Sequence, residues 1–203
     1  MSLVYRAKNL ILTPKTEWAV VAGEEPNADV VFLRYALPLI IVSASATFVG
    51  YAFIRNEGFN DTAFNRGLYF GIQTLLIGAL GLWLTAIVIN ALAQNFGSEK
   101  NIGRAMQLIA YSMTPVWIGG LLMIYPPIGF IGLLFGLYGL YLLYLGLPQM
   151  MKTPHDKIGV YSGFSIVILL VICIALGFIY WIILWDIIVG IFKSVLINSH
   201  PLK

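Results

Sequence analysis

Charged residues are scarce in this sequence. Asp, Glu, Lys and Arg make up 10% of its 203 residues, whereas a soluble domain carries about 25%. Hydrophobic residues make up 60%, and the mean hydropathy is +0.88. A soluble core of this size does not need so much apolar surface. The composition therefore excludes a soluble domain and indicates that lipid surrounds most of the chain.

Cysteine is almost absent, and the basic residues form no cluster. Cys173 is the one cysteine and stands in an apolar run, so it cannot form a disulfide within the chain and is expected to be inert packing. The formal net charge is +3, but the basic residues are scattered and make no basic face. Nucleic acid is therefore not an expected partner.

Patterns typical of catalysis and metal binding are missing too. The sequence contains no GxSxG, HExxH, P-loop or Rossmann fingerprint. His155 and His200 are far apart, and no Glu or Cys stands near them to complete a zinc site. We therefore expect no catalytic residue, no cofactor and no metal site.

Five apolar stretches are present, each about as long as the roughly 20 residues that a bilayer-spanning helix needs. They cover residues 35–54, 68–91, 106–125, 128–147 and 160–184. We predict an all-α integral membrane protein whose five transmembrane helices lie within residues 34–203. The apolar tail, residues 185–203, either prolongs the fifth helix or lies in the membrane interface.

Residues 1–33 carry signals for short amphipathic helices. Thr13-Pro14 is typical of a helix start, and Gly23 and Pro26 are typical of a helix end. We expect this segment to lie on the membrane surface, with Trp18 at headgroup depth. The residues expected as interfacial anchors are Trp18, Arg34, Trp181, Trp185 and Asp186.

Lys and Arg are unevenly distributed between the two sides of the predicted membrane protein. The side with the N-terminus, the second loop and the fourth loop carries eight of them, and the other side carries four. The positive-inside rule therefore predicts a cytoplasmic N-terminus and, with five spans, a C-terminus outside.

Two of the spans carry glycines at helical spacing. In lipid there is little hydrophobic drive between helices, so close backbone approach at small residues is a main source of association. We expect the second and fourth spans to pack closely, with each other or across a dimer. The residues concerned are Gly71, Gly78 and Gly81 in the second span and Gly132, Gly136 and Gly139 in the fourth.

The third span contains a proline flanked by hydroxyl groups. Pro115 frees the carbonyl group of Tyr111 and predicts a kink. Ser112 and Thr114 can satisfy backbone groups that the kink releases. This segment either shapes the helix or presents polar groups at membrane depth as a ligand or ion site.

Three motifs, taken in their order, resemble the bacterial or archaeal branch of the Yip (Ypt-interacting-protein) family. They are residues 9–18 (NLILTPKTEW) ahead of Arg34-Tyr35, residues 110–115 (AYSMTP), and residues 140–147 (LYLLYLGL) followed by Lys152-Thr153-Pro154. The resemblance covers nearly the whole chain. It implies five spans, a cytoplasmic N-terminus and, in a prokaryote, the plasma membrane. Eukaryotic relatives bind small GTPases through a longer N-terminal region, which residues 1–33 do not match.

The leading hypothesis from the sequence is a non-enzymatic membrane protein that packs or oligomerises in the bilayer and organises membrane or partner proteins. Its expected partners are membrane lipids, a second copy of the chain and an unidentified protein. One alternative is a small transporter or channel that uses the kinked third span. Another is a lipid-binding or lipid-handling protein.

Overall fold

The structure is a computed structural model that describes the backbone of residues 2–55 and 61–199 and the side chains of residues 2–55 and 62–183. Within these ranges the regular elements are helical and no strand occurs. Five of the helices are long and apolar enough to cross a membrane. The predicted all-α membrane protein with five spans is thereby confirmed.

The first two spans cover Ala28–Ile54 and Thr62–Phe96. Both contain α-helix with tighter or wider turns at the ends. Their elements are α3 (Ala28–Val31), a π-helical turn (Phe32–Ala36), α4 (Leu37–Val49), a second π-helical turn (Gly50–Ile54), α5 (Asp61–Leu92) and a 3₁₀ turn (Ala93–Phe96).

The remaining spans cover Ile102–Ile124, Pro126–Met151 and His155–Ile183. The last helix continues to Ser199, so the apolar tail prolongs the fifth helix as far as that residue. The elements are α6 (Ile102–Ser112), α7 (Thr114–Gly119), 3₁₀ turns (Gly120–Ile124 and Pro126–Ile131), α8 (Gly132–Met151), a 3₁₀ turn (His155–Lys157) and α9 (Ile158–Ser199).

Several helices begin or end beyond the apolar stretches seen in the sequence, because polar residues cap them there. Asn27 accepts a hydrogen bond from the Val30 amide at 3.0 Å, so the first span begins well before its apolar part. Asn101 caps the third span in the same way through the Arg104 amide, also at 3.0 Å. Gly97 ends the second span with a φ of 67°, which glycine adopts without strain.

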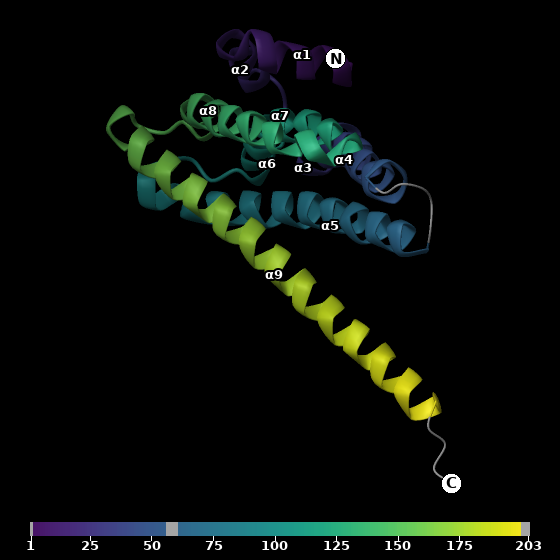
Figure 1. Cartoon of the computed structure of the whole chain (residues 1–203). Helices are drawn as coiled ribbons and strands as arrows, with labels where there is room; N and C mark the ends of the chain where they lie inside the picture. The colour runs from purple at the N-terminus through teal and green to yellow at the C-terminus, as the bar shows by residue number, and fades with distance from the viewer. Residues whose placement is uncertain (1, 56–60, 200–203) are drawn as a thin grey trace.

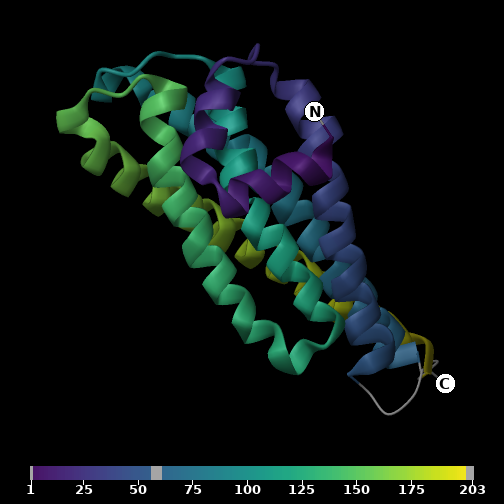
Figure 2. The same ribbon diagram turned by 90° about the horizontal axis from the view of Figure 1, so that it is seen from above.

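Two short helices, α1 (Leu3–Leu12) and α2 (Pro14–Ala22), form an N-terminal hairpin on one flank of the bundle. Figure 1 shows this hairpin as an extra layer beside α8, α7 and α6, and Figure 2 shows it lying over them. The Tyr138 hydroxyl in the middle of α8 donates to the Ile11 carbonyl at 2.7 Å. The hairpin therefore runs along the side of the spans instead of lying flat across their ends.

The five spans form two neighbouring groups. In one, α4 packs along α5; in the other, α6 and α7 pack against α8. The helix α9 lies mainly against α5 and crosses it obliquely, so that its far end leaves the bundle (Figure 1). Tyr161 near the start of α9 donates to the Ile89 carbonyl at 2.7 Å, and Tyr180 donates to the Tyr69 carbonyl at 2.9 Å.

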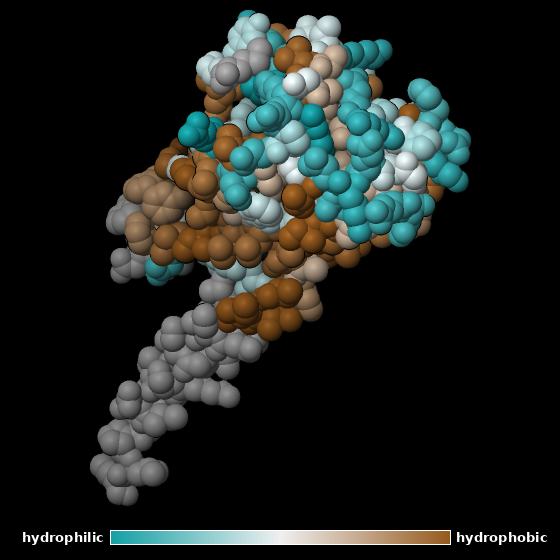
Figure 3. All heavy atoms as spheres, turned by 180° about the vertical axis from the view of Figure 1, so that it is seen from behind, coloured by the Kyte–Doolittle hydropathy of each residue, from teal (hydrophilic) through white to brown (hydrophobic). Residues whose placement is uncertain are grey.

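The surface is divided between polar and apolar regions. Figure 3 shows hydrophilic residues gathered towards one end of the molecule and hydrophobic residues along its flank. We call the end formed by the loops at residues 97–101 and 152–157 the basic end, because Lys100, Arg104, Lys152 and Lys157 lie in or beside these loops. An apolar flank with a polar end is the distribution expected of a protein surrounded by lipid.

A glycine allows the first span to cross the end of the third. A Cβ atom added at Gly50 would lie 1.8 Å from the Met123 carbonyl oxygen and 2.9 Å from that of Ile124. These are backbone atoms that cannot rotate away. We therefore expect Gly50→Ala to destabilise the protein by about 1–3 kcal/mol, the usual cost of overpacking.

Thermal unfolding in detergent would measure this loss, with Gly159→Ala as the matched control. A Cβ atom at Gly159 would meet no described atom within 4 Å, so the control should unfold at or slightly above the parent temperature because alanine favours helix. Equal unfolding temperatures for Gly50→Ala and the parent would contradict the close crossing.

Candidate functional site

The third span is broken in its middle. The helix α6 ends at Ser112 and α7 begins at Thr114, with Met113 between them at φ −82° and ψ −4°. Pro115 occupies the first turn of α7, where its missing N–H is not needed. The predicted kink segment thus joins two short helices. Some of its side chains face the closed interior, and others face a cavity.

One side of the break faces the closed interior. Tyr111, Ser112 and Thr114 are all buried. The hydroxyl groups of Tyr35 and Thr114 are hydrogen-bonded at 2.7 Å, and the rings of Tyr35 and Tyr111 meet edge to face with 4.8 Å between their centroids. The Ser112 hydroxyl is buried without a hydrogen-bond partner among the described residues. These contacts tie the third span to the first.

A buried ion cluster, made of Arg6, Glu17 and Glu24, lies next to this network. Arg6 and Glu17 are 4% and 3% exposed, and their charged groups are 2.7 Å apart. Arg6 also pairs with Glu24, and its guanidinium lies 5.4 Å from the centroid of the Tyr111 ring. Asn9 donates to the second oxygen of Glu17 at 3.0 Å. The cluster joins the two arms of the N-terminal hairpin and places them on the third span.

Arg104 holds the other end of the hairpin. Its guanidinium donates to the carbonyl oxygens of Val21 and Ala22, both at 2.9 Å. These carbonyls belong to the last turn of α2, where no further turn of the helix supplies donors, although the Val21 carbonyl also accepts from the Glu24 amide at 3.1 Å. A cation at this position also interacts favourably with the helix dipole. Arg104 therefore caps α2 and fixes it to the start of α6.

Trp18 has a different position from the one expected. The sequence suggested an anchor at headgroup depth, but Trp18 is fully buried inside the protein. A Cβ atom added at Gly146 of α8 would lie 2.6 Å from its indole ring, so the glycine makes room for the tryptophan. The apolar face of α2 meets α8 and not lipid. Trp18 thus anchors the hairpin to the bundle.

Of the other expected anchors, two have side chains that the structure describes and two do not. Arg34 is exposed beside a cavity of about 320 Å³, which Arg6, Glu24 and Tyr35 also line. Trp181 is exposed on α9 and stacks on Phe178. The side chains of Trp185 and Asp186 lie outside the described residues, and the structure does not place them.

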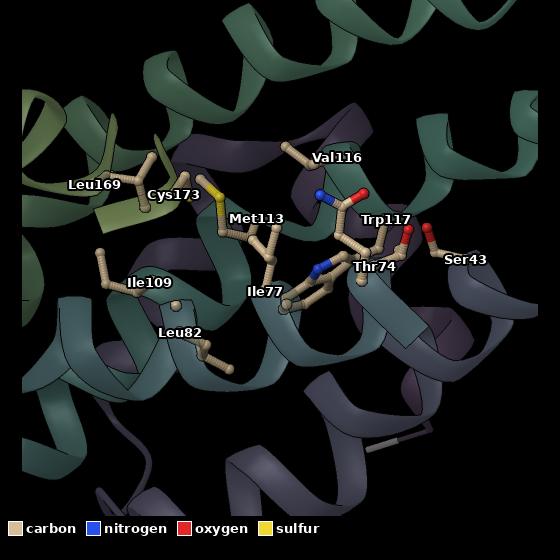
Figure 4. A pocket seen from close by; sticks show the side chains of 13 residues that line it. Ser43, Thr74, Ile77, Leu82, Ile109, Met113, Val116, Trp117, Leu169 and Cys173 are labelled. Carbon is tan, nitrogen blue, oxygen red and sulfur yellow. The ribbon is translucent and has the colours of Figure 1, made fainter. Parts of the chain in front are cut away.

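The opposite side of the break faces a mid-membrane cavity of about 410 Å³, shown in Figure 4. Its described walls come from five helices. They are Ser43 of α4, Gln73, Thr74, Ile77, Gly78, Gly81 and Leu82 of α5, Ile109 of α6, Met113, Val116 and Trp117 of the break and α7, and Leu169 and Cys173 of α9. Cys173 is therefore a wall residue of a cavity, whereas the sequence suggested packing alone.

The cavity has a more polar end and an apolar end. Figure 4 shows Ser43, Thr74 and Trp117 together on one side and Leu82 and Ile109 on the other. The described lining residues include no charged side chain. Among the described residues, no group of three or more His, Cys, Asp or Glu could hold a metal ion. The cavity is therefore suited to binding an uncharged molecule.

The glycines in the two predicted rows make different contacts. A Cβ atom would lie 3.1 Å from Phe48 at Gly71, 2.8 Å from Ile40 at Gly78, and 2.8 Å from the Ser112 carbonyl at Gly139. Gly71 and Gly78 thus pack on α4, and Gly139 packs on α6. The expectation that the second and fourth spans pack on each other is wrong within one chain, because α4 and the α6–α7 pair are their close partners.

The remaining glycines of these rows have more room. A Cβ atom at Gly81 would lie 3.7 Å from Leu176, and one at Gly132 would lie 3.8 Å from the Gly119 carbonyl, both ordinary contacts. At Gly136 it would meet no described atom within 4 Å. Gly136 is therefore the glycine of α8 that faces away from the other described helices.

Sequence reasoning missed the ion cluster, Arg104 and the wall residues of the cavity. Arg6 and Glu17 seemed to be solvent-facing charges on two amphipathic helices. The available signal was the Thr13-Pro14 turn between a helix that carries Arg6 and a second helix that carries Glu17, which allows a hairpin with facing charges. No local pattern points to Arg104, because its partners are some eighty residues earlier in the chain.

Comparison with known proteins identifies one related family. The family model described as the Yip1 domain matches residues 8–177. The match therefore includes most of the N-terminal hairpin, the first four spans and most of the fifth. Searches of the curated proteins and of the solved structures find no significant match.

The ion cluster leads to a testable prediction about the hairpin. Arg6→Met would leave the buried Glu17 carboxylate without its partner, and breaking a buried pair in this way costs about 3–5 kcal/mol. We expect lower stability to denaturant in detergent and faster proteolysis between Leu12 and Gly23. In the double variant Arg6→Met/Glu17→Leu part of the stability should return, because Glu17 no longer places an unpaired charge there.

The control is Lys8→Met, which removes the same charge from an exposed position on the same helix. It should change stability by less than about 0.5 kcal/mol, as surface substitutions usually do. If Arg6→Met and Lys8→Met behaved alike, the ion cluster would not be what holds the hairpin.

Proposed function

The chain belongs to the Yip1 domain family, as its motifs predicted, and on this basis we propose that it is a non-enzymatic, multi-pass membrane protein that self-associates and thereby organises the membrane or partner proteins. The family is not a family of enzymes. This membership supports a role in which contacts between membrane proteins, and not a reaction, are the activity.

The open face of α8 carries the proposal. Gly139 and Gly146 use one side of this helix for contacts within the chain. Gly136 is on another side with free space around it, and Leu133, one turn earlier on the same face, is 73% exposed. A small residue on a lipid-facing side lets a second helix approach closely, and van der Waals contact at such places is a main source of association in lipid.

A transporter of ions receives less support. Ion pathways in membrane proteins are usually marked by ionisable residues that face the interior. The described walls of the mid-membrane cavity have none. The buried ion cluster has charges of both signs that are already paired with one another, and its contacts support a role in fastening the N-terminal hairpin.

We further propose that the basic end lies in the cytoplasm, in the plasma membrane of a prokaryote. The N-terminal hairpin is fastened at that end by Arg104, and the Lys and Arg residues of the second and fourth loops are there as well. The excess of positive charge supports this orientation. The fifth span then places the C-terminus outside.

Self-association can be tested with Gly136→Leu. The added side chain would occupy the space that a neighbouring helix needs, and overpacking of this kind costs about 1–3 kcal/mol, which weakens association about five- to 150-fold. Energy transfer between two fluorescently labelled populations, measured in liposomes over a range of protein-to-lipid ratios, reports the association constant.

The matched control is Gly163→Leu on α9, where a Cβ atom likewise meets no described atom within 4 Å. It should associate like the parent. Unchanged energy transfer in Gly136→Leu would argue against the proposal. An equal loss in both variants would also argue against it, because the effect would then not belong to α8.

The orientation has its own test. A green fluorescent protein fused after Lys203 should remain dark, because it does not fold after export, whereas alkaline phosphatase fused at the same place should be active. The same two reporters fused before Met1 should give the reverse result. Fluorescence from the C-terminal fusion would overturn the proposed topology.

A further inference from the structure

The mid-membrane cavity lies at the depth of the bilayer centre. Ser43, Gly78, Met113 and Leu169 line it, and each is close to the middle of its own span. A molecule in this cavity is therefore surrounded by protein at a level where the membrane contains only lipid tails. Its volume of about 410 Å³ is within the range of about 300–1,000 Å³ that ligand pockets usually have.

Gln73 and Ser43 place polar side chains at one end of the cavity. The amide of Gln73 and the hydroxyl of Ser43 make no hydrogen bond with any described residue. The neighbouring Thr74 is different, because its hydroxyl donates to the Phe70 carbonyl at 2.8 Å. An amide without a partner in the apolar part of a bilayer is costly, so Gln73 is a group that a ligand would satisfy.

The remaining walls restrict the ligand. Leu82, Ile109 and Leu169 make the other end apolar, and the described lining residues include no charged group to pair with an ion. A phospholipid would place its charged headgroup and ester groups near the membrane surface, so that only methylene groups reach Gln73. An uncharged lipid with a small polar group can move to the membrane centre without that cost.

We propose that the mid-membrane cavity binds an uncharged lipid dissolved in the bilayer, whose hydroxyl or carbonyl group hydrogen-bonds to Gln73 and whose apolar chain lies against Leu82, Ile109 and Leu169. The ligand enters sideways from the membrane between α7 and α9. Val116 of α7 lines the cavity and is 37% exposed, and the described lining residues include none from α8. This binding site is independent of self-association through α8.

Photolabelling tests the proposal directly. The purified chain in liposomes is exposed to a long-chain alcohol with a photoreactive diazirine in its alkyl chain, and the labelled residues are located by mass spectrometry. We expect labelling of lining residues such as Met113, Val116 and Leu169, which excess unlabelled long-chain alcohol removes. A long-chain ketone is tested as a second competitor, because it accepts a hydrogen bond without donating one.

Two variants separate the contributions of space and hydrogen bonding. In Gly81→Leu the new side chain enters the cavity, since its first atom has room at 3.7 Å from Leu176, and labelling of the lining residues should be lost. In Gln73→Leu the cavity keeps its volume but loses the amide, and labelling by the alcohol should fall about three- to tenfold. Labelling by a diazirine alkane without a hydroxyl group should not fall.

Gly163→Leu is the control, because it is the same glycine-to-leucine change at a position where a Cβ atom meets no described atom within 4 Å and which does not line the cavity, so it should leave the labelling unchanged. Unfolding temperatures in detergent verify that each variant is folded. Equal labelling of the lining residues in the parent and in Gly81→Leu would overturn the proposal. So would equal labelling by alcohol and alkane in both the parent and Gln73→Leu, which would describe a crevice filled by ordinary lipid tails.

Discussion

Polar groups that lie among lipid tails need partners inside the protein, and the broken third span shows how this chain supplies some of them. The break at Met113 removes regular helix at the level of the membrane centre, which is tolerated only where the surroundings satisfy the freed groups. Tyr35 supplies a hydroxyl to Thr114, and Gly139 lets α8 approach the Ser112 carbonyl. The first and fourth spans are thus positioned by their contacts with the third span.

The N-terminal hairpin shows the limit of reading amphipathic helices from sequence. Periodicity predicts two short helices around Thr13-Pro14, and both are present. It does not tell whether the apolar face meets lipid headgroups or protein, because both surroundings accept the same residues. Trp18 fills a space beside Gly146, more than a hundred residues later in the chain. Such a contact depends on tertiary geometry that a local pattern does not contain.

The spans themselves were predictable, and their partners were not. Hydropathy identifies a transmembrane helix because lipid permits so few alternatives for the backbone, and five spans are found. A row of glycines indicates that another helix can approach one face closely, but it does not identify which helix does so. Gly71 and Gly139 meet different helices, and Gly136 meets none of the described ones. Pro115 indicated the break correctly, yet nothing near it indicated a cavity with walls from four other helices.

The cavity persists because its walls are held apart on both sides. Tyr161 and Tyr180 fix α9 to α5 through hydrogen bonds towards the two ends of the membrane, and Leu169 and Cys173 lie between these two points. The helix cannot move inward to fill the gap without losing one of these bonds. On the facing side Gly78 and Gly81 contribute no side chain to fill it. An apolar molecule that touches these walls gains dispersion contacts with them. The two tyrosine bonds that keep α9 from closing on α5 therefore leave the walls available to the bilayer-dissolved ligand that we propose.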